Sequence, residues 1–304
     1  MEYILEICNL EKRYGKFNAI SKLNMKIPKG AIYGLIGKNG AGKTTLIRIV
    51  CGLQKPTLGK YTIYGVSNEN KKIIKSRKRL GAIIETPSIC LDMTAEENLK
   101  EQYKLLGLPN YEGIEELLKL VELDKTGKKT AKHFSLGMRQ RLGIAIALAG
   151  NPDILILDEP INGLDPEGII EIRELIIKLN KERGITFLIS SHYLDELAKI
   201  ATCYGIIDKG KMIREISSSE LENSFKKKVQ INVNDIKECV KYLEEEKIAY
   251  KVISDEIIDI YERINVSDLV IALSKKNCIV NSFKEKDETL ENYFLNLVGG
   301  ADNV

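Results

Sequence analysis

A glycine-rich loop that carries a lysine and a threonine is the stretch of this chain best suited to chemistry. Its glycines, Gly37, Gly40 and Gly42, have no Cβ, so successive backbone N–H groups can turn inward and cradle phosphate oxygens at the start of a helix. Lys43 would then reach the β- and γ-phosphates of a nucleoside triphosphate, and the Thr44 hydroxyl would contact Mg²⁺. The loop therefore predicts a phosphate-binding site.

Two adjacent acids end a continuous apolar run further along the chain. Residues 154–157 have the length and composition of a fully buried parallel strand, and Asp158 and Glu159 follow at once. One carboxylate at a strand end could be a surface accident. Two of them downstream of a phosphate loop suit a Mg²⁺ contact from Asp158 and activation of a water molecule by Glu159.

The chain has two histidines, and they differ in placement. The predicted strand 186–190 leads directly to Ser191 and His192, so His192 would point from a strand end towards the phosphates. His133 has no such placement, and we expect it at the surface.

Two further candidates each allow a structural and a functional interpretation. Ser135 is an expected N-cap, and together with Gly137 it would form either a helix cap or a second phosphate-binding helix terminus. Tyr14 precedes Gly15 between two predicted strands, so its ring would serve either as turn packing or as a stacking surface for adenine.

These residues need a scaffold that brings them together, and the hydrophobic pattern predicts an α/β one. Strands are expected at 3–7, 20–27 and 31–36, with a helix over 46–50 after the glycine loop. A further strand from Leu80 ends at Glu85. The segment that follows, about 88–150, is mostly helical and is expected to form a helical subdomain. Its helices are predicted at 95–106 and 113–121, joined by a turn at 107–110, with a third opening after Ser135; another helix is expected over 167–181.

The last part of the chain is predicted to form a second, smaller domain. The expected order is strand 229–233, helix 235–247, strands 250–253 and 257–261, helix 266–275 and strand 278–283, followed by a helix over 289–297. This β-α-β-β-α-β order is typical of a ferredoxin-like α+β domain. We place the domains at 1–216 and 217–304. The second contains no evident catalytic constellation, which favours a packing or dimer-supporting role over ligand sensing.

Composition limits the setting in which the protein works. The chain has 304 residues, of which 44% are hydrophobic, enough for one large and one small core. A net charge of +3 spread over both signs gives no indication of a nucleic-acid surface. Six cysteines without paired spacing fit a reducing cytosol, and no apolar stretch is long enough to span a bilayer, so action at a membrane requires a partner.

In their order and spacing these motifs resemble those of the ATP-binding subunits of ABC transporters, over about residues 1–215. The resemblance implies a P-loop NTPase core with a mixed sheet and a helical subdomain, ATP and Mg²⁺ as ligands, and ATPase activity. It assigns Tyr14 to adenine stacking, Asp158 and Thr44 to the metal, Glu159, His192 and Lys43 to catalysis, and Ser135, Gly137, Gln140 and Asp165 to nucleotide contacts. The nucleotide-binding loop under this resemblance comprises Gly37, Asn39, Gly40, Ala41, Gly42, Lys43, Thr44 and Thr45.

At three positions the chain departs from the common family pattern, and these departures point to one branch of the family. Leu136 and Met138 stand where the signature motif usually has glycine and glutamine, and Glu85 stands where the family usually has a glutamine. With the stretch 162–165, these features are similar to the branch that exports bacitracin-type antibiotics and lantibiotics. Glu85 is expected either to ligate Mg²⁺ or to contact a membrane subunit only.

The resemblance also implies partners. Two ATP-binding subunits, identical or different, would sandwich two ATP molecules, each held by Lys43 and Thr44 of one subunit and by Ser135 and Gly137 of the other. An integral-membrane permease would hold the pair at the cytoplasmic face of the membrane, and no nucleic acid is expected. The function implied is export of, or immunity to, a peptide antibiotic. The alternatives are export of sodium or another drug, or a soluble non-transport ABC ATPase.

Overall fold

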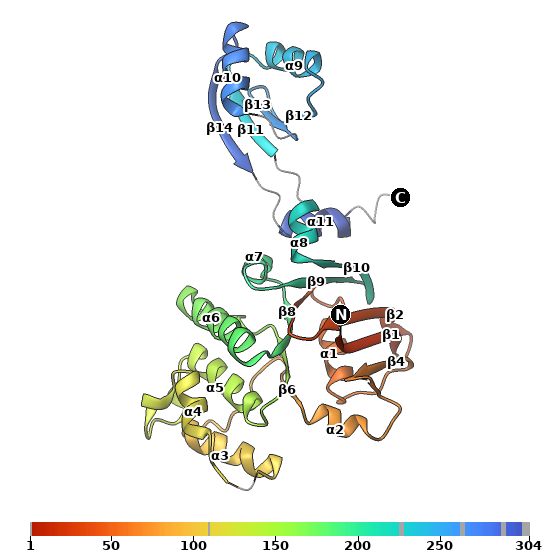
Figure 1. The fold of residues 1–304 in the computed structure, drawn as a ribbon, viewed down its shortest axis with the longest axis vertical. Coiled ribbons are helices and arrows are strands. Elements are labelled where there is room, and N and C mark those ends of the chain that lie inside the picture. Colours follow the sequence, from red (N-terminus) through yellow and green to blue (C-terminus); the bar gives the residue numbers. More distant parts are fainter. Residues whose placement is uncertain (1, 109, 225–227, 262–264, 287–289, 300–304) are drawn as a thin grey trace. The chain divides into compact units, whose positions relative to one another are not determined.

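The computed structural model describes residues 2–108, 110–224, 228–261, 265–286 and 290–299. The chain divides into two compact units, residues 1–218 and 219–304 (Figure 1). Pro109 of the predicted turn and Thr289 at the predicted start of the last helix lie outside the described residues.

A mixed six-stranded sheet forms the centre of the first unit, in the order β10-β9-β3-β8-β7-β6. Five strands are parallel, and β10 pairs antiparallel with β9 at one edge. The strands are β3 (Ile32–Ile36), β6 (Leu80–Ile83), β7 (Ile154–Asp158), β8 (Thr186–Ser191), β9 (Cys203–Asp208) and β10 (Lys211–Ser217). Since the carboxyl ends of parallel strands share one edge, β3, β7 and β8 deliver the glycine loop, the two acids and His192 to the same place.

An antiparallel sheet in the order β2-β1-β4-β5 lies beside the glycine loop. Its strands are β1 (Tyr3–Tyr14), β2 (Phe17–Pro28), β4 (Leu58–Ile63) and β5 (Val66–Ser67). The predicted strands 3–7 and 20–27 are therefore too short. Several register shifts break the alternation of apolar and polar residues along β1 and β2, which hid their full length from the hydrophobic pattern. The strands β4, β5 and β9 were not predicted.

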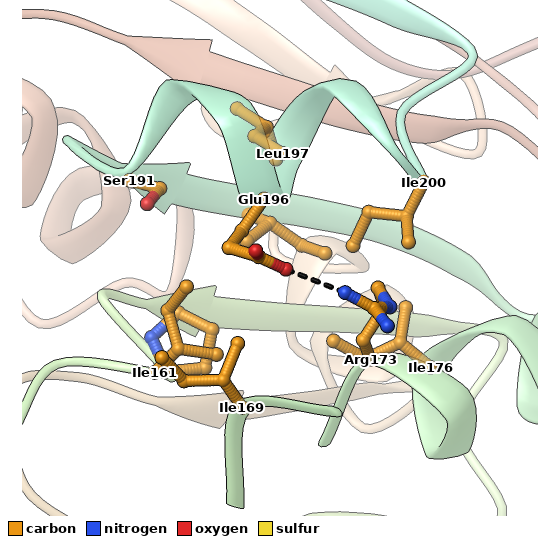
Figure 2. A pocket seen from close by; sticks show the side chains of 10 residues that line it. Ile161, Ile169, Arg173, Ile176, Ser191, Glu196, Leu197 and Ile200 are labelled. Carbon is orange, nitrogen blue, oxygen red and sulfur yellow. Dashed lines mark hydrogen bonds and ion pairs between the residues drawn. The ribbon is translucent and has the colours of Figure 1, made fainter. Parts of the chain in front are cut away.

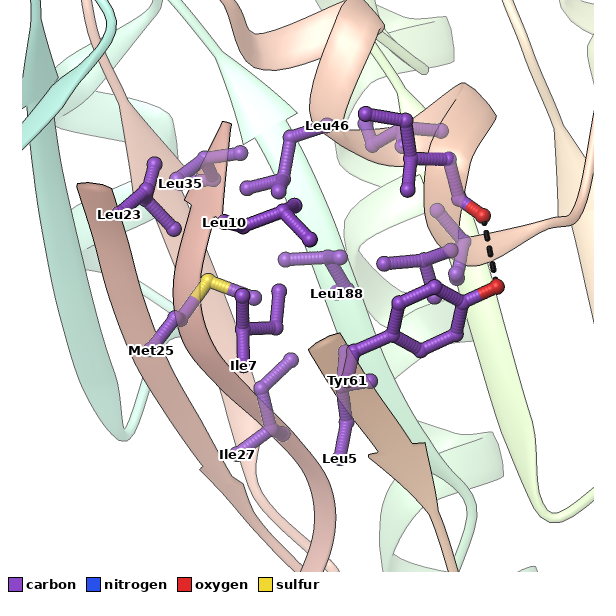
Figure 3. Close-up of a cluster of buried hydrophobic side chains, with 14 of the residues drawn as sticks. Leu5, Ile7, Leu10, Leu23, Met25, Ile27, Leu35, Leu46, Tyr61 and Leu188 are labelled. Carbon is purple, nitrogen blue, oxygen red and sulfur yellow. Dashed lines mark hydrogen bonds between the residues drawn. The ribbon is translucent and has the colours of Figure 1, made fainter. Parts of the chain in front are cut away.

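Helix α1 (Lys43–Val50) follows the glycine loop and packs into a hydrophobic core of this unit. Leu46 on α1 belongs to the same cluster as Leu5 and Leu10 from β1 and Leu188 from β8 (Figure 3). The Tyr61 hydroxyl donates a hydrogen bond of 2.9 Å to the carbonyl oxygen of Ile49, at the end of the helix. The core thus fixes α1 against both sheets, and with it Lys43 and Thr44.

The predicted helical segment is confirmed and contains α3 (Ala95–Leu106), α4 (Ile114–Leu120) and α5 (Leu136–Leu148), with short 3₁₀ turns at Asp124–Thr126 and Ala131–His133. These helices pack on one another, and α5 also contacts β6 and α6 (Pro166–Arg183). Thr94 begins α3 with a capping box completed by Glu97. Two short helices also belong to this unit. Helix α2 (Ile73–Arg77) lies within the basic run 71–79, which is predicted to be a solvated helix face, whereas α7 (Leu194–Ala198) was not predicted.

The second unit has the predicted β-α-β-β-α-β order. Its strands form one antiparallel sheet in the order β12-β13-β11-β14, the arrangement of a ferredoxin-like domain. Its core includes Ile231, Leu243, Ile258 and Leu273. Its elements are β11 (Lys228–Val233), α9 (Ile236–Glu245), β12 (Tyr250–Val252), β13 (Ile257–Ile260), α10 (Val266–Lys275), β14 (Val280–Lys286) and α11 (Leu290–Gly299); helix α8 (Ser218–Ser224) precedes them.

Candidate functional site

The glycine loop owes its shape to two different properties of glycine. Gly40 and Gly42 have φ angles of +81° and +107°, which other residues rarely adopt. Gly37 has no positive φ, contrary to the expectation that all three glycines are needed for backbone conformation. It is needed for space, because a Cβ at that position would lie 2.6 Å from the carbonyl oxygen of Ile207.

Lys43 begins α1 and its side chain is only 6% exposed. Its ammonium group donates a hydrogen bond of 2.7 Å to the carbonyl oxygen of Gly37 and lies 3.4 Å from Glu159 Oε1. The buried cation is therefore held over the loop and balanced by the second acid of the pair that ends β7.

Asp158 is buried at the end of β7 and receives two hydroxyl groups. Thr44 Oγ1 donates a hydrogen bond of 2.8 Å to Asp158 Oδ2, and Ser190 Oγ donates to the other oxygen, Oδ1. Asp158 and Ser190 are register partners on β7 and β8, which explains this contact. Ser190 was not among the predicted site residues, although a hydroxyl residue near the end of an apolar strand was a signal for it.

The oxygen atoms of Thr44 and Asp158 fit a magnesium ion. The described residues contain no group of three or more His, Cys, Asp or Glu side chains that could hold a metal ion by themselves. Mg²⁺ at nucleotide sites does not need one, since it takes one or two protein oxygens and completes its shell with phosphates and water.

Glu159 is the centre of the site. Its Oε2 lies 2.7 Å from His192 Nδ1 and accepts a second hydrogen bond of 3.2 Å from the backbone N–H of His192. Its own backbone N–H donates to the carbonyl and the hydroxyl oxygen of Ser190, both at 3.1 Å, with φ at +51°. This left-handed conformation is costly for a glutamate and turns the side chain from β7 towards His192.

A cavity of about 290 Å³ opens beside the loop and is lined by Tyr14, Phe17, Ala19, most of residues 38–45 and Glu159. The Lys12 ammonium lies 5.1 Å from the centre of the Tyr14 ring, and the Tyr14 hydroxyl donates to Gln54. Tyr14 is nonetheless 44% exposed, and Phe17, its register partner across the hairpin, is 62% exposed. Phe17, an aromatic residue two positions after Gly15, was not among the predicted site residues.

The other predicted nucleotide contacts lie away from this cavity. Ser135 is confirmed as the N-cap of α5, with its Oγ accepting from Met138 N at 3.2 Å, and it is exposed. Gly137 lies in the first turn of the same helix, but Gln140 is buried and 7% exposed. Asp165 caps α6 by accepting from Gly168 N at 3.2 Å. Within one chain, these four residues do not line the cavity that the glycine loop forms. His133 is exposed, as expected.

Glu85 is not brought into contact with Thr44 and Asp158 in this structure. Its Oε1 lies 2.7 Å from Arg48 Nη2, and the two side chains line a different cavity, of about 500 Å³. Its predicted role as a metal ligand has no support from this arrangement.

A partly buried ion pair supports the segment that carries His192. Figure 2 shows Arg173 of α6 and Glu196 of α7 facing each other in the lining of a small cavity, with Nη1 and Oε2 2.7 Å apart. Lys199 binds the other carboxylate oxygen at 2.6 Å, and hydrogen bonds from Lys199 and Arg173 hold the pKa of Glu196 below its ordinary value. The pair ties α7, which begins just after His192, to α6.

Comparison with known proteins decides the family. The ABC transporter family model matches residues 20–162. The chain is 40% identical to the bacitracin transport ATP-binding protein BcrA of Enterococcus faecalis over 303 residues, which cover 99% of this chain and 98% of that protein. The chain belongs to the ABC transporter ATP-binding protein family.

Two further comparisons agree with this assignment. This ABC transporter ATP-binding protein is 44% identical to the lantibiotic transport ATP-binding protein SrtF of Streptococcus pyogenes over 220 residues, 72% of this chain and 93% of that one. It matches the dimeric structure of a post-hydrolysis state of the ATP-binding cassette MJ0796, bound to ADP and Pi, with a TM-score of 0.63 and 26% identity over 70% of this chain and 98% of that one.

The family recognised from the sequence is therefore confirmed, and with it the activity. The ABC transporter ATP-binding protein binds and hydrolyses ATP as the energy-supplying subunit of a transporter. Among its described residues, no helix has the length and apolar character needed to cross a membrane.

Proposed function

We propose that this ATPase powers the export of a peptide antibiotic of the bacitracin type through a separate integral-membrane permease. The observation that carries the proposal is the 40% identity with a bacitracin transport protein over 99% of this chain, which includes the second unit. The alignment with the lantibiotic transport protein covers 93% of that protein but only 72% of this chain. The second unit therefore favours bacitracin over a lantibiotic.

The residues around Glu159 have the chemistry that ATP hydrolysis requires. Glu159 accepts a proton from the attacking water, Lys43 binds the β- and γ-phosphates, and His192 contacts the γ-phosphate. The two groups that contact Glu159 in the structure, Lys43 and His192, are the two that would meet the phosphates. Binding of a triphosphate would draw Lys43 from Glu159 and leave the carboxylate free to take a proton. Tyr14 stacks on the adenine, on the ring face opposite Lys12.

Thr44 and Asp158 would hold Mg²⁺ in this proposal, with Ser190 orienting the carboxylate. The ion would offset the negative charge of the phosphate oxygens during the reaction. Orientation of a ligating carboxylate by a neighbouring hydroxyl is a common feature of such sites.

A pair of ATP-binding subunits completes each site. Ser135 is exposed at the start of α5 and lies outside the cavity of its own chain, so this helix terminus suits a phosphate held by a second subunit. The dimeric state of the related cassette MJ0796 supports this arrangement. The partner is a second copy or a related subunit, and the permease holds the pair at the cytoplasmic face of the membrane.

The proposal is tested by purifying the membrane subunit that binds this protein and reconstituting the complex in proteoliposomes. Bacitracin should stimulate ATP hydrolysis more strongly than a lantibiotic or sodium ions, and the Lys43→Ala complex should show no stimulation. Stimulation by a lantibiotic alone, or by sodium alone, would overturn the substrate. Failure to recover any membrane partner would favour a non-transport ABC ATPase.

A further inference from the structure

The ion pair between Arg48 and Glu85 connects α1, which carries Thr44 of the proposed metal site, with the residue that follows β6, the strand beside Asp158. Arg48 lies on α1 four residues after Thr44, so both side chains project from the same face of the helix. Glu85 follows β6, whose last residue Ile83 is the register partner of Leu157, the residue before Asp158. Neighbouring strands lie about 4.8 Å apart, so Glu85 is at the same sheet edge as Asp158.

The backbone forms a tight turn at Glu85, which holds the Cα and Cβ atoms of this residue in place. Glu85 has a φ of +64°, which is unusual for a residue with a Cβ, and Thr86 N donates a hydrogen bond of 2.9 Å to the carbonyl oxygen of Ile84 across it. The chain is therefore tightly turned at this residue. With the backbone held in this turn, a movement of the carboxylate between Arg48 and the sheet edge that carries Asp158 would be made by rotation of the side chain.

Arg48 is the cation that pairs with Glu85. The cavity of about 500 Å³ around Glu85, which we call the Glu85 groove, is also lined by Arg77. Arg77, however, donates a hydrogen bond to the Tyr61 hydroxyl, and its guanidinium group lies against Gly52. Arg48, by contrast, forms the ion pair with Glu85 at 2.7 Å.

The pair is suited to reversible contact. The side chains of Arg48 and Glu85 are 38% and 61% exposed, and ion pairs of such exposure are weak in water. A stronger attraction for either partner can break it. A carboxylate released towards Thr44 and Asp158 would repel a triphosphate without metal, but it would favour the metal-bound form.

We propose that Arg48 is a positioning residue that holds the Glu85 carboxylate in the Glu85 groove and away from the Thr44–Asp158 pair. Arg48 thereby sets how strongly nucleotide binding depends on Mg²⁺. The inference rests on the proposed metal site, but not on the identity of the exported substrate.

The test measures the affinity of the full-length protein for trinitrophenyl-ATP, in EDTA and across a Mg²⁺ titration. The variants are Arg48→Met, Glu85→Gln, the double variant and Arg48→Lys. Arg48→Met should weaken binding in EDTA by about three- to tenfold, and Mg²⁺ should restore it. In the Glu85→Gln background the same change should have no effect, because the carboxylate that Arg48 holds is gone. Arg48→Lys should stay close to the parent.

A matched control is Arg183→Met, which removes the arginine of an exposed pair with Glu116 far along the chain and should leave both affinities unchanged. The proposal is overturned if Arg48→Met weakens binding equally in the parent and in the Glu85→Gln background, since that result would show a purely structural role. It is also overturned if Arg48→Met changes neither affinity. Failure of the metal site itself would appear differently, as a parent protein whose binding does not respond to Mg²⁺.

Discussion

Glu159 Oε2 lies 2.7 Å from His192 Nδ1, and this contact joins the ends of two neighbouring parallel strands, β7 and β8. The same carboxylate binds Lys43 through its other oxygen, at 3.4 Å. One acid thus connects the phosphate loop to the histidine, and it does so with a side chain that is 20% exposed. An acid in this position can exchange a proton with a water molecule while its neighbours bind phosphate.

We expect Glu159→Gln to lower the rate of ATP hydrolysis by about 10²- to 10⁴-fold, the usual contribution of a general base. Nucleotide binding should persist, because glutamine keeps the shape of the side chain, and a dimer should accumulate with ATP. Steady-state ATPase assays and size-exclusion chromatography with ATP measure both effects. Glu182→Gln, an exposed acid on α6, is the control. Hydrolysis at the parent rate would refute the assignment.

His192→Ala should reduce ATP hydrolysis by roughly tenfold or more, since it removes a group that orients Glu159 and contacts phosphate. The chain offers its own control in His133, the other histidine, which is exposed and belongs to no part of the site. The rates of His133→Ala and the parent should agree. Equal losses in the two variants would show that His192 has no specific role.

Ser190→Ala should raise the Mg²⁺ concentration needed for half-maximal activity by about tenfold, because Asp158 Oδ1 loses the hydroxyl that orients it. The maximal rate at saturating Mg²⁺ should change less. A Mg²⁺ titration of ATPase activity measures the difference, with Ser274→Ala at the exposed end of α10 as the control. An unchanged titration would mean that Ser190 only fills space in the core.

A protein ending at Ser218 should still bind ATP, because the residues that line the proposed nucleotide cavity all belong to the first compact unit. Its affinity for trinitrophenyl-ATP should remain within about threefold of the full-length value. The binding free energy would then change by less than about 1.4 kcal/mol, the amount that corresponds to a tenfold change in affinity. Circular dichroism establishes that the shortened chain is folded. A folded protein that has lost all binding would show that the second unit completes the site.

Local patterns were sufficient to predict much of this protein. The glycine loop, the acids after a buried strand and the histidine after the next one were recognisable because parallel strands bring their carboxyl ends to one edge. The helices 95–106 and 266–275 were predicted at their observed bounds, since caps and apolar spacing are local properties. The β-α-β-β-α-β order of the second unit followed from the same periodicity.

Other features were decided by contacts between distant residues, which a linear pattern does not contain. The hydroxyl of Ser190 meets Asp158 only because β8 pairs with β7 in one register. The need for Gly37 comes from Ile207, which lies 170 residues away in sequence. Glu85 was recognised as unusual from its position in the chain. Its ion pair with Arg48 could not be predicted, because it forms only where the fold brings α1 close to the residue that follows β6. The sequence thus determined which groups are present, and the tertiary structure decided which of them neutralise one another.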